Sequence, residues 1–304
     1  MGKPVKDRLT EFSVYHRDGD GECNAIVLKK YAEKRRLGKR DKFDLSYFFS
    51  VVYCCESGII LFNNIDCIKE DPIGIAKLLK KDMIFQSDRK YMKMRNCFEN
   101  AMKFWTENLQ TDTINKYVNQ GILDLQKAID EVEKWYMFGR FSAFLFLETY
   151  ATLMDLEVTD TTIDWPNGDT ATSGLLNLSG KDQEAEAFDK TGKLTESTQK
   201  MDAMLEKVRE VIRKVGGDTN TTKIETSLCA YRKFYKGTRY DGYYLDRMLE
   251  ELNLYCNKKE YDDITKDLFG IRKKCFKSDF LGELHGWSGV RKEQKKLYME
   301  YGII

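Results

Sequence analysis

The sequence predicts an all-α protein, and three observations carry that prediction. Only three prolines, at positions 4, 72 and 166, occur in 304 residues, so few positions break a helix. Apolar residues recur with a helical period along most of the chain, whereas the alternation typical of strands is scarce. With 42% hydrophobic and 33% charged residues, a chain of this length can bury a core without disulfide or metal staples.

The expected helices follow from the spacing of their apolar side chains. Between Ile122 and Tyr136 these side chains fall on one face, which predicts an amphipathic helix. Residues 142–156 are apolar on nearly every side, so this helix is expected at the centre of the core. The same spacing predicts further helices over 22–37, 44–62, 87–109, 201–215, 222–236, 242–256, 260–276 and 291–301.

The segment from Asp164 to Thr198 has a different composition. It is rich in Gly, Thr, Ser, Asp and Asn, which favour turns and helix caps. Its first part, with Trp165 and a leucine cluster at 175, 176 and 178, is expected to pack against the core. The sequence therefore predicts a helical domain over 1–178, a connection over 179–198 and a C-terminal helical lobe over 199–304.

Charge and cysteine content limit the possible partners and cofactors. The formal net charge is only +1, so electrostatic attraction of a partner requires a local patch. The eight cysteines form no C-x-x-C pair and only two histidines are present, so no metal site and no cofactor are expected. No signal peptide or membrane span is evident, and we expect free thiols in the cytoplasm, or in the host cytoplasm if the protein is viral.

A glycine turn between two helical patterns allows two interpretations. In "WYMFGRFSA", Gly139 is either an ordinary turn or part of a hairpin that grips a nucleic-acid phosphate through Met137, Gly139 and Arg140. The stretch is similar to the pattern L-P-G-V-G-R-x-x-A of helix–hairpin–helix DNA glycosylases, with Met137 in place of the first glycine. That resemblance places Asp160 about where those enzymes carry a catalytic aspartate.

Two basic segments indicate phosphate binding. Residues 29–42 hold eight Lys or Arg against two acidic residues, a strong local excess. A second segment, "FQSDRKYMKMR", mixes cations with Tyr91, as do sites that stack a base and hold its phosphates. The alternative is a solvated helix face. The candidate phosphate-binding residues are Arg17, Arg35, Arg36, Arg89 and Lys93.

Three segments together resemble a known family. "FSVYHRDGDGE…KKYAEKRRLGKRDKFDLSYFFSVVYCCES", "FQSDRKYMKMRNCF" and "WYMFGRFSAFLFLE" are similar to the helical proteins of phage thymine hypermodification. That group includes the α-glutamyl/putrescinyl-thymine pyrophosphorylases, the amino acid:DNA transferases and the helical domain of 5-hydroxymethyluracil DNA kinases. The resemblance covers about residues 10–180. Where commoner members are expected to carry an aromatic–Asn–x–x–Arg element, this chain reads "FFSVVYCCES", as in a divergent branch.

The resemblance implies a reaction on double-stranded DNA that carries a modified thymine. An amino acid or polyamine would displace pyrophosphate from 5-pyrophosphomethyl-uracil. This chemistry requires cations for the leaving group, a carboxylate for the amine and a pocket for a flipped base. Asp160, Asp164 and Asp88 are the candidate carboxylates, although an Asp in such a position is more often a helix cap. Tyr15, Tyr91 and Trp165 are the candidate stacking residues, although each is more often a core aromatic.

Three alternatives remain open at this point. A thiolate of Cys54 or Cys55 could add to C6 of uracil, although thiols in an apolar run are more often structural. The chain could instead be a helical DNA-binding module without chemistry. It could also be a glycosylase-like base-excision enzyme, although no nucleophilic lysine and no four-cysteine cluster are evident in the sequence.

Overall fold

The computed structural model describes residues 5–85, 94–159, 163–166, 168–180, 187–189, 191–236, 239, 242–256 and 258–276. Over these residues the expected all-α class is confirmed, because helices dominate and the strands are three segments of two residues each. The chain divides into two compact units, one formed by residues 1–23 and 160–245 and the other by 24–159 and 246–304. We call them unit 1 and unit 2 and describe each by itself.

Unit 1 is built from four helices around a hydrophobic core. They are α1 (Val5–Asp18), α12 (Asp169–Leu178), α13 (Thr198–Lys214) and α14 (Thr221–Tyr235). The core includes Trp165 and the leucine cluster, which confirms that this part of the turn-rich segment is packed. Helices on both sides of residues 179–198 share this unit, and the division into domains 1–178 and 199–304 stays a prediction about independent folding.

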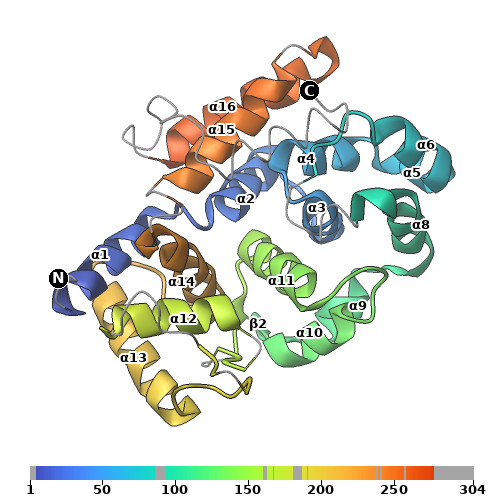
Figure 1. Ribbon diagram of the computed structural model, residues 1–304. Helices are drawn as coiled ribbons and strands as arrows, with labels where there is room; N and C mark the ends of the chain where they lie inside the picture. The colour runs from blue at the N-terminus through green and yellow to red at the C-terminus, as the bar shows by residue number, and fades with distance from the viewer. Residues whose placement is uncertain are drawn as a thin grey trace. The chain divides into compact units, whose positions relative to one another are not determined.

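A glycine allows α12 and α14 to approach closely. The two helices lie side by side in Figure 1 and make extensive mutual contact. A Cβ atom added to Gly174 would overlap the carbonyl group of Leu228, with only 3.0 Å to its carbon atom. Since a backbone carbonyl within a helix cannot move aside as a flexible side chain can, this contact requires glycine.

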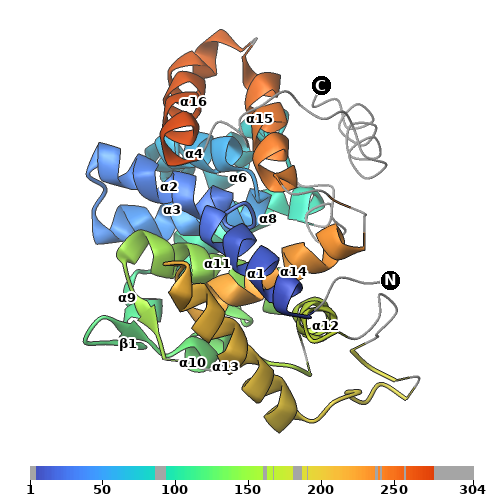
Figure 2. The same cartoon turned by 90° about the vertical axis from the view of Figure 1, so that its left-hand side faces the viewer.

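Unit 2 contains the remaining elements. The first part of the chain contributes α2 (Cys23–Arg35), α3 (Lys39–Val52), α4 (Cys55–Asn63), α5 (Ile65–Glu70), α6 (Pro72–Leu79), α8 (Phe98–Asn108) and α9 (Asp112–Asn115). These are followed by β1 (Val118–Asn119), β2 (Ile122–Leu123), α10 (Leu125–Val132), α11 (Arg140–Met154) and β3 (Glu157–Val158). The C-terminal part adds α15 (Tyr243–Tyr255), which begins in unit 1, the 3-10 turn η1 (Lys259–Tyr261) and α16 (Asp262–Cys275), which contacts α4 (Figure 2).

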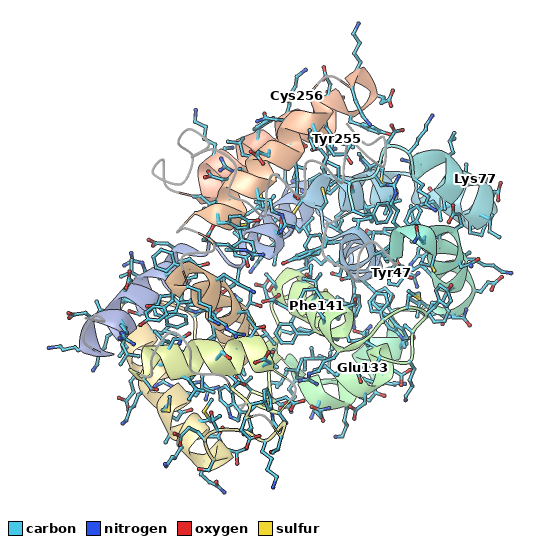
Figure 3. The ribbon with its side chains drawn as sticks, in the orientation of Figure 1. Tyr47, Lys77, Glu133, Phe141, Tyr255 and Cys256 are labelled. Atoms are coloured by element: carbon cyan, nitrogen blue, oxygen red, sulfur yellow. The ribbon has the colours of Figure 1, made fainter. Side chains whose placement is uncertain are left out.

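The core of unit 2 is the aromatic contact between α3 and α11. The ring of Phe43 lies 5.4 Å from that of Phe146 on α11, and the ring of Tyr47, labelled in Figure 3, stacks 5.4 Å from that of Phe138 in the turn just before α11. Buried side chains occur on all sides of α11, from Ser142 to Leu153. This confirms the expectation of a central helix over 142–156.

The helix expected over 122–136 starts later than its apolar pattern predicts. Ile122 and Leu123 pair antiparallel with β1, and they pair in parallel with β3. Gln120 and Gly121 form the two-residue turn with φ values of 49° and 82°, a combination typical of hairpin turns. Asp124 then caps α10 by accepting a hydrogen bond from the N–H of Lys127. The expectation of one helix through this region is therefore wrong at its first residues.

Other expected helices differ in their bounds. The helix expected over 44–62 is two helices, because Tyr53 adopts a left-handed conformation and ends α3. The second half of the helix expected over 87–109 is α8, and the segment 291–301 lies outside the described residues. The helices α1, α5, α6, α9 and α12 were not expected. The helices expected over 22–37, 142–156, 201–215, 222–236, 242–256 and 260–276 are confirmed with shifts at their ends.

The contact at Gly174 gives a test of the packing in unit 1. Gly174→Ala is expected to lower the free energy of unfolding by about 1–3 kcal/mol, because the added methyl group overpacks the α12–α14 contact. Gly270→Ala is the matched control, since its Cβ would meet no atom within 4 Å, and it is expected to raise stability by about 0.5–1 kcal/mol. Urea unfolding followed by circular dichroism measures both. Equal stability of the two variants would contradict the close contact.

Candidate nucleic-acid interface

The turn between α10 and α11 has the backbone geometry of a tight hairpin. Met137 is exposed and has a φ of 63°, in the region that glycine adopts most easily. Met137 also stands where the glycosylase pattern has its first glycine, so this position takes that conformation without being a glycine. The N–H of Phe138 bonds back to the carbonyl of Trp135 at 3.0 Å and tightens the turn.

Gly139 leaves open space at the start of α11. It is the N-cap residue of the helix, with φ and ψ of −119° and −177°, an extended conformation that any residue can adopt. No heavy atom beyond its chain neighbours lies within 4 Å of where a Cβ would be. The fold therefore does not need glycine here. An anion could approach the first turn of α11, where the helix dipole favours negative charge.

A cluster of aromatic and charged side chains of unit 2 lies beside this helix start. The ring of Phe141, labelled in Figure 3, is 6.1 Å from that of Tyr53, the left-handed residue that ends α3. The guanidinium of Arg247 lies over the Tyr53 ring at 5.4 Å and bonds to Glu251 at 3.1 Å. Sequence reasoning missed this cluster. Its signal was the i,i+4 spacing of Arg247 and Glu251 in "DRMLEEL".

Most cations of the basic segment 29–42 are already paired with carboxylates. Asp267 of α16 lies 2.6 Å from Lys34 and 2.8 Å from Arg35, and Asp155 pairs with Lys29. Two more pairs are local: Lys30 with Glu33 and Arg40 with Asp44. Within the described part of the chain, the cations of this segment without a carboxylate within ion-pair distance are Arg36, Lys39 and Lys42. The segment is therefore less positive than its composition suggests.

The hairpin and the basic segment lie at opposite ends of one helix pair. Phe43 near the start of α3 meets Tyr150 near the end of α11, whereas Tyr53 at the end of α3 meets Phe141. The two helices therefore run antiparallel. Since α3 has 14 residues, its ends are about 20 Å apart at 1.5 Å per residue. The hairpin and the segment 29–42 cannot hold the same phosphate.

Two of the expected stacking residues lie in the core of unit 1. Tyr15 is buried, its hydroxyl donates to Asp20 at 3.2 Å, and its ring is parallel to that of Phe234 at 6.4 Å. Trp165 is buried and donates its indole N–H to Asp202 at 2.8 Å. Either ring would have to leave these contacts to stack on a base.

The other candidates of unit 1 are closer to solvent. Arg17 is partly exposed and bonds to the neighbouring Asp18 at 3.0 Å. Asp164 is partly exposed, and its carbonyl accepts a hydrogen bond from Gly168 at 2.7 Å just before α12. The candidates Asp88, Arg89, Tyr91, Lys93 and Asp160 lie outside the described residues.

A buried titratable network lies in unit 1. His16 bonds through Nε2 to the carbonyl of Asp218 at 2.6 Å, and a carbonyl only accepts, so Nε2 carries the proton. The hydroxyl of Ser227 then donates to Nδ1 at 2.7 Å. Burial holds the pKa of His16 below its usual value, which favours the neutral ring. This contact resembles an activated serine, but Ser227 is only 1% exposed, which keeps a substrate away from it.

Glu22 completes that network, and its carboxyl is buried beside His16. Its carboxyl lies 3.7 Å from His16 Nδ1, and burial raises its pKa to about 7. A protonated glutamic acid avoids placing an uncompensated charge in the core. The network therefore contributes to the stability of unit 1 in a pH-dependent way.

The cysteines offer little support for thiolate chemistry. Cys54 and Cys55 are both buried, and burial raises the pKa of the Cys54 thiol well above its usual value. The Cys55 sulfur lies 3.2 Å from the side-chain oxygen of Asn24. All eight cysteines are free thiols. Among the residues that the structure describes, no group of three or more His, Cys, Asp or Glu side chains is arranged to hold a metal ion.

The pKa of Glu22 predicts a pH dependence of stability. Since the folded-state pKa is raised, the stability that the protonated acid contributes is present below about pH 4.5 and is lost as the pH rises through about 7. Glu22→Gln should therefore gain about 2–3 kcal/mol relative to wild type between about pH 5 and about pH 8. Urea unfolding at both pH values measures the difference.

Two details sharpen this test. The lowered pKa of His16 acts in the opposite sense, because the stability that neutral His16 contributes is lost as the pH falls below about 6.5. This effect is present in both the wild type and Glu22→Gln, so it does not change the difference between them. Exposed Glu133 (Figure 3) serves as the control, and Glu133→Gln should differ from wild type by the same amount at both pH values. A pH-independent difference for Glu22→Gln would show that Glu22 is charged in the folded state.

Comparison of the sequence with known protein families shows which family the chain resembles. The amino acid:DNA transferase family matches residues 68–240, more than half of the sequence. This range overlaps the resemblance expected over 10–180 and contains the 137–140 turn and Asp164, whereas the basic segment 29–42 lies outside it. No curated protein matches the chain, and none of the described helices has the length and apolar character of a membrane span. The chain belongs to the amino acid:DNA transferase family and is a transferase whose partners are DNA and an amino acid.

Proposed function

We propose that the transferase acts on DNA in which uracil carries a pyrophosphomethyl group at C5. The amine nitrogen of an amino acid or polyamine attacks the exocyclic methylene carbon. The C–N bond forms as the C–O bond breaks, and pyrophosphate leaves with the bonding electron pair. The new ammonium group loses one proton to a base. The family match over 68–240 carries this proposal.

Asp164 is our candidate for the group that accepts that proton. It lies within the family match and is partly exposed, so it can meet a substrate. Its neighbour Trp165 is held by Asp202, which limits the freedom of the backbone at this point. Asp160 and Asp88 stay candidates from the sequence.

We assign DNA contact to two surfaces of unit 2. The first is the start of α11, with Met137, Gly139 and Arg140, where a backbone phosphate would approach the helix dipole. The second is the end of the basic segment, where Arg36 and Lys39 are exposed. At about 20 Å apart, the two surfaces would contact different phosphates of the same duplex.

One reaction separates this function from its alternatives. The full chain is incubated with pyrophosphomethyl-uracil DNA and pooled amino acids and polyamines, and pyrophosphate and digested nucleosides are measured. The proposal expects pyrophosphate release that depends on the amine, with a nucleoside heavier by the amine. Release of a free base would indicate a glycosylase, and unchanged DNA that is nevertheless bound would indicate a binding module.

Gly139→Ser tests the hairpin without harming the fold. Serine is a good N-cap residue, so the free energy of unfolding should stay equal or rise by about 0.5 kcal/mol. Its hydroxyl would occupy the N–H groups that a phosphate needs, so affinity for duplex DNA should fall about tenfold. Fluorescence anisotropy over a salt series measures this. Undiminished affinity would exclude the hairpin from the interface.

The same anisotropy measurement over a salt series tests the basic segment 29–42. Replacing Arg36 and Lys39 together by Gln should lower the slope of log affinity against log salt by about 2, because each phosphate contact contributes about 1. Arg35 is unsuitable for charge reversal, since a carboxylate there would face Asp267.

Asp164→Asn tests the carboxylate. The substitution is nearly isosteric, so a purely structural Asp164 would cost at most about 1 kcal/mol of stability and leave turnover intact. As the proton acceptor it should lose about a hundredfold or more in rate. Asp66→Asn is the control, because the Asp66 side chain is 91% exposed. Full turnover by Asp164→Asn would move the search to Asp160 and Asp88.

A further inference from the structure

An exposed apolar side chain lies at the turn between α10 and α11. Met137 is 38% exposed, and this turn lies between Glu133 and Phe141, which are labelled in Figure 3. Among the described residues, the other large hydrophobic side chains that are exposed lie on helices: Val14 on α1, and Ile73 and Leu78 on α6. An apolar side chain in an exposed turn gains less from burial than a core residue does, so the fold alone is a weak reason for it.

The backbone conformation of Met137 adds to this point. Its φ is 63°, where the Cβ atom of an L-residue is crowded and glycine is preferred. The other described non-glycine residues with a positive φ are polar or, in the case of Tyr53, carry a ring that packs against Phe49 at 5.6 Å. A glycine at position 137 would form the turn with less strain. An apolar side chain that is kept in a strained and exposed position points to a function.

The residues beside Met137 hold the turn rigidly. Trp135 and Phe138 are both buried, and their rings lie 5.5 Å apart. The N–H of Phe138 bonds to the carbonyl of Trp135 at 3.0 Å, and the Phe138 ring stacks on Tyr47 of α3. The backbone that carries Met137 is therefore already ordered, and little conformational entropy is lost there when a partner binds.

The size of this apolar surface and its surroundings favour DNA as the partner. A stable protein interface buries about 800 Å² on each side, far more than one methionine side chain offers. In DNA, by contrast, a single apolar side chain can enter a base step and unstack it. The chain belongs to a family whose partners include DNA, and Met137 lies within the matched residues 68–240. The open space at Gly139, two residues further on, lets a DNA backbone come close to the turn.

We propose that Met137 enters the base stack of duplex DNA as a wedge. The proposal rests on the proposed function in one respect, namely that the start of α11 contacts the DNA backbone. A phosphate held at the start of α11 brings the adjacent base step to the turn, where the flexible thioether chain fits between the bases. A base that has lost its stacking can leave the duplex more easily. Met137 is therefore a positioning residue for the base and takes no part in bond formation.

The test is the fluorescence of a duplex that carries 2-aminopurine in place of adenine, because this base fluoresces more strongly when it is unstacked. The duplex contains no modified thymine, no amine is added, and the full chain is present at a concentration that saturates binding. Wild type should raise the fluorescence, and Met137→Ala should lose most of this rise. Met137→Leu should keep it, since leucine also enters base steps. The slope of log affinity against log salt should be the same in all three, because no phosphate contact is removed.

Two further variants separate the wedge from general effects. Leu78→Ala is the matched control, because Leu78 is 57% exposed on α6 of the same unit, and it should leave the fluorescence rise unchanged. Met137→Gly removes the side chain and relieves the strained φ of 63°. Its midpoint of urea unfolding should equal that of wild type or exceed it, whereas the fluorescence rise should be lost as in Met137→Ala.

Three results would overturn the wedge. They are an absent rise with wild type, an equal rise with wild type and Met137→Ala, and a lower urea midpoint for Met137→Gly, which would assign the side chain to the fold. The proposed reaction is tested separately, because the probe carries no pyrophosphomethyl group. A fluorescence rise without turnover of pyrophosphomethyl-uracil DNA would keep the wedge and reject the reaction. Turnover without a fluorescence rise would keep the reaction and reject the wedge.

Discussion

Unit 2 depends on the aromatic contact between α3 and α11. Phe43 meets Phe146 and Tyr150 edge to face, which gains energy beyond that of buried area alone. Asp44 on α3 is buried and accepts hydrogen bonds from Arg40 and from the indole of Trp105 on α8, so the same helix also fixes its other neighbour. Burial raises the pKa of Asp44, and these two donors compensate its charge. The position of α3 therefore determines where the ends of α11 lie.

The packing of α3 against α11 separates the two candidate DNA contacts, the hairpin and the basic segment 29–42. Because the two helices run antiparallel, the hairpin before α11 lies near Tyr53 at the end of α3. The basic segment lies at the opposite end of the helix pair, where Lys29 pairs with Asp155 just after α11. An interface built on both ends is extended, and binding to it depends on the distance along the DNA backbone as well as on charge. A single compact pocket that uses both ends is excluded by the length of α3.

The sequence predicted helices correctly where the pattern of apolar residues was local. It did not predict contacts between residues that are far apart in the sequence. The all-apolar pattern of 142–156 predicted the central helix because burial on every side leaves that signature. The neutralisation of Arg35 could not be predicted, since Asp267 is 232 positions away. Helix α12 was missed because its Gly, Ser and Thr residues are turn formers, and here they allow close contact with α14. At the candidate site, Gly139 and Met137 were identified from their motif, whereas Arg247 and Glu251 are placed by the fold and carry no motif.

The two basic groups of the chain show why a count of charges is a poor guide to ligand binding. The segment 29–42 holds more cations, but they are largely exposed and most have a carboxylate partner, so water and existing ion pairs already stabilise them. The end of α14 holds fewer cations, but the Arg232 side chain is only 11% exposed, and burial together with the neighbouring charges lowers the pKa of Lys233. The exposed cations of the segment 29–42 that have no carboxylate partner among the described residues are therefore suited to the weak and salt-sensitive contacts of a DNA backbone.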